Sequence, residues 1–572
     1  MSRRQDRTFV AILIGVAVLW WIPQRAGPID LRSDGAIYYV LGTSLAEGQG
    51  YRLLNEPGNI RAVQYPPLLP LIVAAYQKAL ATSDFILVGR WLRAFYFCVF
   101  MVLAATVYRV ARQFLPTRRA FLAGLICMFA LHIWYFAGAL YTEIPFALIA
   151  TGFILCARRA DRRGLWLATA ALGIAAYLLR TAGISLLAAW VVEALIRRPT
   201  TEQREGPLSL GPRVREAAAR SAAALLPIVA WHAYIATVTS SPEYGHPAYS
   251  YQRAPYQYSN VTYPENISLV SPFAPERGRM TTARWVSRLA RNAAFIVPSL
   301  GGAVTAQRAF WELAMTDVNR YLRCGRLPAH LALLPMTAIG AVVLAGAMVM
   351  VRRRQYLLPL CCGAAAAMMS VTPWPEQFVR YFAPMIPFLS IMLVTALGAA
   401  LDSTTTDAHR GLRWAARALL LAVLTMVLAE DAYVAWWTFR FNPARPVMYV
   451  DDAGRVTTGQ LLFYEAEAAA MDEALEEVRR RAQPGDVVAS SMPHWAYLRT
   501  GVKSILPPME ADPDHAQRLL DEVPVRFVVL DELQYPRISQ RYAAPAVEDH
   551  PDTWRRIYRS PDGRARLYEH VR

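Results

Sequence analysis

The sequence predicts a polytopic α-helical membrane protein with about eleven spanning helices, followed by a small α/β domain exposed to water. The chain has 572 residues, of which 55% are hydrophobic and only 18% are charged. Its mean hydropathy is positive, at +0.23. A soluble chain of this length would carry more surface charge. Apolar stretches recur as far as residue 437, whereas residues 438–572 have the mixed pattern of a soluble domain.

Apolar segments suited to a bilayer recur along residues 1–437. They lie at about 9–23, 91–113, 120–138, 143–157, 164–179, 182–196, 221–239, 331–351, 356–372, 381–401 and 413–437. The first segment follows a basic N-terminus and precedes no small-residue cleavage site, so we expect a retained helix rather than a signal peptide. Several segments are short for a hydrocarbon core about 30 Å thick, and buried loop backbone must complete those crossings.

Arginine-rich connectors set the orientation of these segments. They occupy alternate connections, at 116–119, 158–163, 197–220, 351–354 and 409–417. The positive-inside rule places these connectors and the basic N-terminus in the cytoplasm. A further apolar segment at 66–82 would break this agreement if it crossed the membrane. We therefore expect it to form a helix at the outer surface.

This topology places most of the extramembrane chain on the outer face. Two outer loops, 24–90 and 240–330, join the C-terminal domain there, and we expect the membrane to be a bacterial inner membrane. Within the domain, residues 465–481 have a helical pattern and 525–531 have the pattern of a buried strand. Pro561-Asp562-Gly563 marks the turn of a terminal hairpin.

The charge and cysteine content argue against several classes of function. The net charge of +17 comes largely from arginines clustered beside apolar segments, which fits membrane topology and argues against a nucleic-acid partner. The six cysteines show no metal-ligand spacing, so we expect neither a disulfide framework nor a metal site. The C-terminal domain contains no glycine-rich phosphate loop, and we predict no cofactor.

Four ionisable residues stand at the outer ends of apolar segments, where a charge is costly unless it faces a polar cavity. Asp34 precedes apolar residues at helical spacing, among them Tyr38, and we expect an amphipathic helix against the outer leaflet. A simple helix N-cap is the alternative role for Asp34. Glu143 lies at the outer mouth of a span, and Arg180 and Arg380 face outward. Snorkelling to lipid headgroups is the alternative for each arginine.

Five short motifs occur in a fixed order along the chain. They are Asp34 after the first span, YPPL at 65–68, TEIPF at 142–146, LLRTAG at 178–183 and RYFAPMIPF at 380–388. Together they resemble the GT-C membrane glycosyltransferases, in particular the branch of protein O-mannosyltransferases and aminoarabinose transferases. The resemblance covers roughly residues 9–400 and leaves the soluble tail largely unmatched.

The resemblance implies a GT-C fold and an enzyme that moves a sugar from a polyprenyl-phosphate carrier to a glycan, lipid or protein acceptor at the outer face. Inversion of configuration is the usual outcome in this family. The resemblance assigns the general base to Asp34 and stabilisation of the leaving lipid phosphate to Arg180 and Arg380. Glu143 would line the same cavity and orient the acceptor or an arginine.

Tyrosines supply the remaining candidate substrate-binding residues. The resemblance implies that Tyr65 shapes the sugar pocket, and Tyr38 is placed beside it because it shares the helix that Asp34 begins. Tyr65 stands where aminoarabinose-type members have Lys, which argues against that particular donor. The Tyr-rich segment 243–266 of the long outer loop fits either a membrane anchor or a lid over the sugar site.

Two other functions remain open from the sequence alone. A transporter or flippase for a lipid-linked saccharide would use the same charged groups facing a membrane cavity. Such proteins usually have related halves, and no internal repeat is evident here. A saccharide polymerase would share the donor class with the proposed enzyme. The sequence specifies neither the sugar nor the acceptor.

Overall fold

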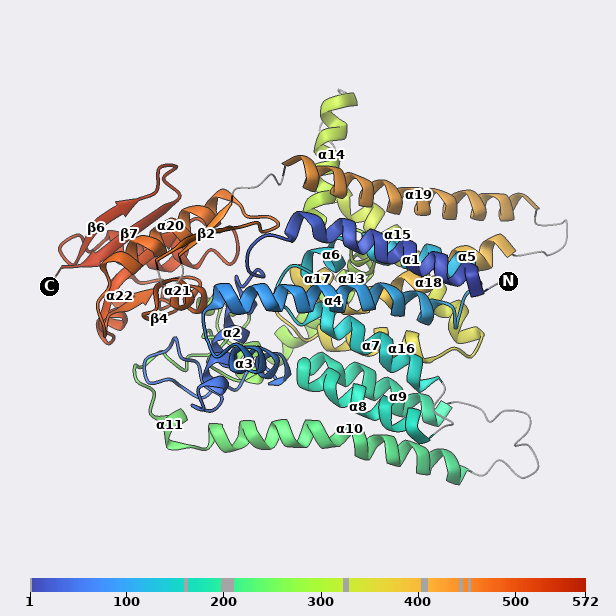
Figure 1. The fold of residues 1–572 in the computed structure, drawn as a ribbon, viewed down its shortest axis with the longest axis horizontal. Coiled ribbons are helices and arrows are strands. Elements are labelled where there is room, and N and C mark those ends of the chain that lie inside the picture. Colours follow the sequence, from blue (N-terminus) through green and yellow to red (C-terminus); the bar gives the residue numbers. More distant parts are fainter. Residues whose placement is uncertain are drawn as a thin grey trace.

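The computed structural model describes residues 3–158, 163–196, 210–322, 329–402, 410–441, 446–450 and 454–571. Figure 1 shows a bundle of long helices that run along the long axis of the molecule, with the C-terminal α/β domain at one end. Parts of the arginine-rich connectors, at 159–162, 197–209 and 403–409, lie outside the described residues.

Each predicted span contains a helix. These helices are α1 (Arg3–Trp21), α4 (Phe85–Ala111), α5 (Thr117–Phe129) with α6 (Leu131–Phe136), α7 (Glu143–Ala157), α8 (Arg163–Leu179), α9 (Ile184–Ile196), α10 (Leu210–Thr239), α15 (Leu333–Arg352), α16 (Leu357–Met369), α18 (Ile386–Asp402) and α19 (Arg410–Phe441). Among the described residues, six helical segments are long and apolar enough to cross a membrane. The number of eleven spans stays a prediction.

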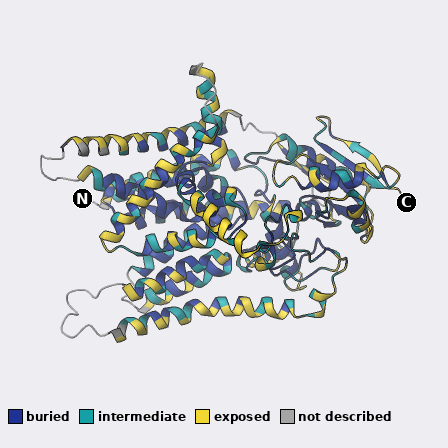
Figure 2. Ribbon diagram, turned by 180° about the vertical axis from the view of Figure 1, so that it is seen from behind, coloured by how far each residue is buried: buried dark blue, intermediate teal, exposed yellow. Residues whose placement is uncertain are grey.

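The outside of the bundle is apolar. Large hydrophobic side chains are exposed along the outer helices, with Leu226 of α10 at 65% and Leu419 of α19 at 63% exposure. Figure 2 shows exposed residues running along these two helices while the interior of the bundle is buried. A surface of this kind is stable against lipid rather than water, which supports an integral membrane protein.

The first outer loop contains two short helices, α2 (Asp34–Ala46) and α3 (Leu68–Leu80). The prediction that α2 lies against the outer leaflet as an amphipathic helix is wrong, because Gly35 through Ser44 are buried on all sides. It packs against α3 and against α21 (Pro493–Thr500) of the C-terminal domain. Gly42 permits this packing, since a Cβ there would lie 2.6 Å from Val73 of α3. In Figure 1, α3 is seen nearly end-on beside α4, as a helix at the outer surface would be.

The second outer loop, 240–330, contains more helix than its sequence pattern predicts. Besides α11 (Pro242–Gly245) and α12 (Tyr263–Ile267), it forms α13 (Thr282–Ala303) and α14 (Arg308–Leu322). Gly301 and Gly340 bring α13 and α15 into backbone contact, because a Cβ on Gly301 would lie 1.9 Å from the Met336 carbonyl oxygen. In Figure 1, α14 projects away from the bundle.

The C-terminal domain has a five-stranded sheet in the order β4-β3-β5-β7-β6. Its strands are β3 (Val487–Ala489), β4 (Lys503–Ile505), β5 (Val525–Asp531), β6 (Trp554–Arg559) and β7 (Ala565–His570). The first three are parallel, and β6 and β7 form the antiparallel hairpin that the sequence predicts. The predicted helix is α20 (Ala466–Arg481), which packs against β5 and β7. The other elements are β1 (Val447–Val450), β2 (Val456–Gly459), α22 (Pro513–Asp521) and α23 (Ala544–Glu548).

Hydrogen bonds dock this domain onto the first outer loop. Asn55 and Ser504 exchange two of them, from the Asn55 amide to the Ser504 carbonyl at 3.0 Å and from the Ser504 N–H to the Asn55 carbonyl at 2.8 Å. Arg32 donates to the carbonyl oxygen of Leu462 at 3.2 Å. Because all three bonds end on backbone carbonyl oxygens, they fix the domain in register with the loop.

Two ion pairs join helices at the end of the bundle opposite the C-terminal domain. Arg112 at the end of α4 pairs with Asp6 of α1 at 3.1 Å, and Arg119 of α5 pairs with Asp402 of α18 at 2.5 Å. Figure 1 places the N-terminus at this end, opposite the C-terminal domain. The orientation of the two ends relative to the membrane stays a prediction.

Reporter fusions test this topology. A fusion at Asp161, in the connector outside the described residues, should report a cytoplasmic position, because the arginine-rich connectors stay inside. A fusion after Arg572 should report the outer compartment. Paired alkaline phosphatase and fluorescent protein reporters would measure both. Signals from the same side at the two positions would contradict the predicted number of spans.

Candidate active site

Four charged side chains meet at the outer end of the bundle. Oε1 of Glu143 accepts hydrogen bonds from Nη1 of Arg180 at 2.9 Å and from Nε of Arg380 at 3.1 Å. Arg380 uses its other arm, Nη2, to donate to Oδ2 of Asp34. The four predicted charged residues therefore form one network, although Asp34 and Arg380 are 346 positions apart.

Helix ends bring this network together. Asp34 is the first residue of α2 and Glu143 is the first residue of α7. Arg180 follows α8 directly, and Arg380 lies in the short helix α17 (Phe378–Tyr381). Carboxylates at helix N-termini are stabilised by the helix dipole, typically by about 0.3–1 kcal/mol. Both acids stand at helix N-termini.

The backbone in front of Asp34 is strained. Ser33 has φ 54° and ψ −125°, a conformation that residues other than glycine rarely adopt. Ser33, not Asp34, is the N-cap of α2, and it makes no side-chain cap hydrogen bond. The alternative role of Asp34 as a simple helix cap is therefore not supported. Strain of this kind persists where the surrounding structure holds a functional side chain in place.

Glu143 lies behind the cavity wall rather than in it. Its side chain is only 1% exposed, whereas those of Arg180 and Arg380 are 20% and 24% exposed. The expectation that Glu143 lines the cavity is therefore wrong, and its contacts are with the two arginines. Without its charge, two guanidinium groups would face each other in a poorly hydrated place.

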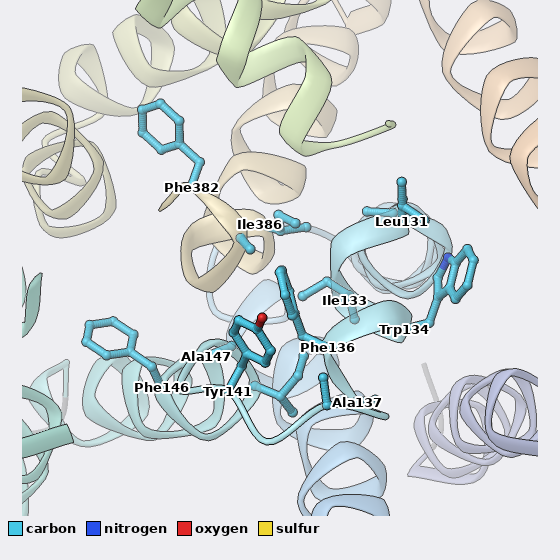
Figure 3. Close-up of a cluster of buried hydrophobic side chains, with 14 of the residues drawn as sticks. Leu131, Ile133, Trp134, Phe136, Ala137, Tyr141, Phe146, Ala147, Phe382 and Ile386 are labelled. Atoms are coloured by element: carbon cyan, nitrogen blue, oxygen red, sulfur yellow. The ribbon is translucent and has the colours of Figure 1, made fainter. Parts of the chain in front are cut away.

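Aromatic rings support both arginines from the side. The Arg380 guanidinium lies 4.7 Å from the Tyr141 ring centroid and 5.8 Å from that of Phe136. These two rings lie together in the buried cluster of Figure 3, with centroids 5.1 Å apart. Arg180 lies 5.6 Å from the Tyr381 ring centroid. Such contacts restrict where each guanidinium can point.

The network opens into a cavity of about 640 Å³ between the bundle and the C-terminal domain. This volume lies within the range of small-molecule sites. Asp34, Arg180 and Arg380 line it, together with Tyr38 and Tyr65, whose rings meet edge to face at 5.3 Å. Five of the six predicted site residues therefore line the cavity, and Glu143 is the sixth, which does not.

The two tyrosines keep their hydroxyl protons. Burial, with a further contribution from the Asp34 carboxylate, raises the pKa of Tyr38 above its usual value. The same two causes raise the pKa of Tyr65. Both phenols therefore remain neutral near pH 7 and present hydroxyl groups that donate or accept hydrogen bonds.

Other lining residues come from the second outer loop, from the segment after α16 and from the C-terminal domain. Tyr258 and Tyr263 come from the Tyr-rich segment, which thus contributes to the cavity wall. Trp374 precedes η6 (Pro375–Gln377), and His494 and Tyr535 come from the C-terminal domain. Their place depends on how the domain docks, which no local pattern encodes. Among the described residues, no cluster of three or more His, Cys, Asp or Glu residues suits a metal ion.

Neutralising Glu143 tests its place between the arginines. Glu143→Gln keeps the shape but leaves two partly buried guanidinium groups with Asp34 as their remaining counter-charge. Breaking a buried pair costs about 3–5 kcal/mol, so the variant should have a clearly lower Tm in thermal unfolding of the purified protein. Glu532→Gln, at an exposed position of the C-terminal domain, is the control and should unfold like the wild type. Equal Tm values for all three proteins would contradict the network.

Comparison with known proteins finds similarity in fold rather than in sequence. No protein-family model and no curated protein sequence matches the chain. ArnT from Cupriavidus metallidurans in the apo state aligns over 99% of this chain and 98% of its own, with 14% identity and a TM-score of 0.50. ArnT bound to undecaprenyl phosphate aligns over 100% and 99%, with 13% identity and a TM-score of 0.48.

A third structure is the oligosaccharyltransferase from Archaeoglobus fulgidus in the apo form. It aligns over 100% of this chain and 75% of its own, with 13% identity and a TM-score of 0.49. At these identities the likeness concerns the fold alone. The fold of apo ArnT, with a TM-score of 0.50, agrees with the fold that the resemblance implies.

Proposed function

We propose that this protein is a membrane glycosyltransferase that moves a sugar from a polyprenyl-phosphate donor to an acceptor hydroxyl at the outer face. Asp34 acts as the general base, and the configuration at the sugar is inverted. One observation carries the proposal: Asp34 and two arginines face one cavity, where the buried Glu143 holds both arginines and Arg380 holds Asp34.

The arginines suit the phosphate of a lipid donor. Guanidinium groups bind phosphate oxygens through two parallel hydrogen bonds, which fixes both position and orientation. Arg180 and Arg380 stand at the outer ends of apolar helices, at the level where a lipid phosphate would lie. A preorganised cation at a leaving group stabilises the negative charge that grows during bond breaking.

The proposed reaction needs only the groups at this wall. Asp34 takes the proton of the acceptor hydroxyl as its oxygen attacks the anomeric carbon. The bond between that carbon and the phosphate oxygen breaks, and the polyprenyl phosphate leaves with the electron pair. Arg180 and Arg380 stabilise the released charge. Attack from the face opposite the phosphate inverts the anomeric centre.

The apo network suggests the order of binding. Oδ2 of Asp34 is paired with Arg380, which orients that oxygen toward the guanidinium group. A donor phosphate is a stronger ligand for Arg380 and would compete with Asp34 for it. Donor binding would then release Asp34 toward the acceptor. The base becomes available only when there is a sugar to transfer.

Asp34→Asn tests the base. The variant keeps the size and can still accept a hydrogen bond from Arg380, but it cannot take the acceptor proton. Sugar transfer should fall by about 10²-fold or more, with donor binding retained. The assay is release of polyprenyl phosphate from a panel of radiolabelled lipid-phosphate sugars by the purified protein.

A matched control separates base catalysis from helix capping. Asp84 is the N-cap of α4, and its carboxylate accepts from the N–H groups of Ile86 and Leu87. Because Asn and Asp are nearly equivalent caps, Asp84→Asn should keep normal activity. Full transfer activity in Asp34→Asn would exclude the proposed base. Substrate flux without transfer in wild type would favour a transporter.

The donor site is tested with the arginines. Arg180→Ala and Arg380→Ala should each lose a charge-assisted contact of about 1.5–3 kcal/mol to the donor phosphate. Binding of labelled polyprenyl phosphate to the protein in nanodiscs measures this loss. Arg90→Ala is the control, since Arg90 is exposed at the outer start of α4 and suits headgroup contact only. Wild-type binding by both cavity variants would place the phosphate elsewhere.

A further inference from the structure

The C-terminal domain supplies one wall of the cavity. The wall comes from two loops that follow parallel strands, one after β3 with Ser491 and His494, the other after β5 with Leu533 and Tyr535. In open α/β sheets, ligands bind beyond the carboxyl ends of the parallel strands. The domain therefore presents to the cavity the edge that such folds use for binding.

One buried carboxylate ties the two loops together. Oδ2 of Asp531 accepts from the Ser491 hydroxyl at 2.6 Å, and its Oδ1 accepts from the Leu533 N–H at 3.1 Å. Asp531 is only 3% exposed, and it does not line the cavity. The loops are thus held in one relative position before any ligand binds, which lowers the ordering cost of binding.

The cavity walls differ in charge. The charged residues that line it in the described chain are Asp30, Arg32, Asp34, Arg180 and Arg380. All of them come from the helical part. The lining residues of the C-terminal domain include no Asp, Glu, Lys or Arg. A ligand with an anionic group therefore has partners on the bundle wall, whereas the domain wall suits an uncharged ligand.

Three polar atoms of cavity-lining residues lack partners, one in the C-terminal domain and two in the helical part. Nε2 of His494 is buried and has no hydrogen-bond partner among the described residues, and the residue is 5% exposed. Nε1 of Trp374 and Oε1 of Gln64 are also buried and have no hydrogen-bond partner among the described residues, and both residues line the cavity. Buried polar groups are nearly always hydrogen-bonded in folded proteins. A ligand rich in hydroxyl groups, which both donate and accept, matches polar side chains of this kind.

His494 is held neutral. Burial lowers the pKa of its imidazole to about 3, so it carries no charge near pH 7. A neutral imidazole has one donor and one acceptor nitrogen and pairs well with a hydroxyl group. It offers a phosphate or sulfate no charge attraction. This agrees with the absence of charged side chains on its wall.

Aromatic rings complete the uncharged side. Phe273 stands between Trp374 and Tyr535, with ring centroids 6.1 Å and 5.4 Å away. The three rings come from the second outer loop, the segment after α16 and the C-terminal domain. Flat apolar faces beside a few directed polar groups suit the C–H face of a sugar ring.

We infer that the C-terminal domain carries the acceptor subsite, and that this subsite binds an uncharged, hydroxyl-bearing saccharide through His494, Trp374 and Tyr535. The inference rests on the proposed function and names its acceptor class. The donor phosphate binds at the bundle wall, which carries the arginines, and the acceptor binds at the uncharged wall of the C-terminal domain. Asp34 lies on the cavity that both substrates enter.

Direct binding tests the subsite without any turnover. The full-length protein in nanodiscs is mixed with neutral methyl glycosides of mannose, galactose, glucose and N-acetylglucosamine, and binding is followed by saturation-transfer NMR. At least one neutral glycoside should bind to the wild type. His494→Met should weaken it about tenfold, whereas His494→Gln, which can restore a hydrogen bond near Nε2, should retain most of the affinity.

Two further variants keep the test decisive. Tyr535 is 47% exposed, so Tyr535→Ala should fold normally and still weaken glycoside binding. His515→Gln, on the exposed part of α22 next to Glu510, is the matched histidine control and should bind like the wild type. Normal binding in both His494→Met and Tyr535→Ala, or no binding of any neutral glycoside to the wild type, would overturn the inference.

Other ligand classes give distinct results. If phosphorylated sugars or a serine-containing peptide bind in a His494-dependent manner and neutral glycosides do not, the assigned acceptor class is wrong. Failure of the proposed function looks different: glycosides bind through His494, but no lipid-phosphate sugar is consumed by the wild type. Where transfer is observed, His494→Met should raise KM for the glycoside and leave KM for the lipid donor unchanged.

Discussion

The site depends on how one buried carboxylate holds two guanidinium groups. Glu143 is nearly inaccessible to solvent and accepts from both Arg180 and Arg380 through the same oxygen. Unpaired charges at the edge of a bilayer cost several kcal/mol, so this arrangement is required for the arginines to remain there. With Asp34 included, two positive charges balance two negative ones. The charges of the network are therefore balanced, and an anion that binds Arg380 competes with a carboxylate.

A second constraint is the docking of the C-terminal domain onto the first outer loop. Arg93 of α4 is buried and donates to the carbonyl oxygens of Gln24, Ala26 and Pro28, which fixes the chain as it leaves α1. Asn55 then pairs with the edge strand of the domain sheet. Through these contacts, the loop that carries Asp34 and the domain that carries His494 share one rigid frame. The cavity therefore has walls from both parts of the chain.

The sequence predicts the charged half of this site better than the neutral half. Asp34, Glu143, Arg180 and Arg380 are conspicuous because a charge in an apolar setting needs a reason. The pairing of these residues and the burial of Glu143 depend on how the helices pack. A hydropathy pattern does not predict helix packing. The burial of α2 was missed because its covering elements, α3 and α21, lie far apart in the chain. His494 matters because its nitrogen lacks a partner, and only a folded structure reveals such an absence.

The pairing of the cavity carboxylates also bears on which of them is suited to be the base. Among the described residues, Asp30 and Asp34 are the acids that line the cavity. The Arg32 guanidinium donates to both carboxylate oxygens of Asp30, to Oδ1 at 3.0 Å and to Oδ2 at 2.6 and 3.2 Å. Arg32 also donates to a backbone carbonyl of the C-terminal domain. Asp34 has one partner, Arg380, which also faces the place proposed for the phosphate. A ligand that engages Arg380 frees Asp34, whereas freeing Asp30 would require the domain contact to break. In the proposed reaction, donor binding therefore activates Asp34 alone.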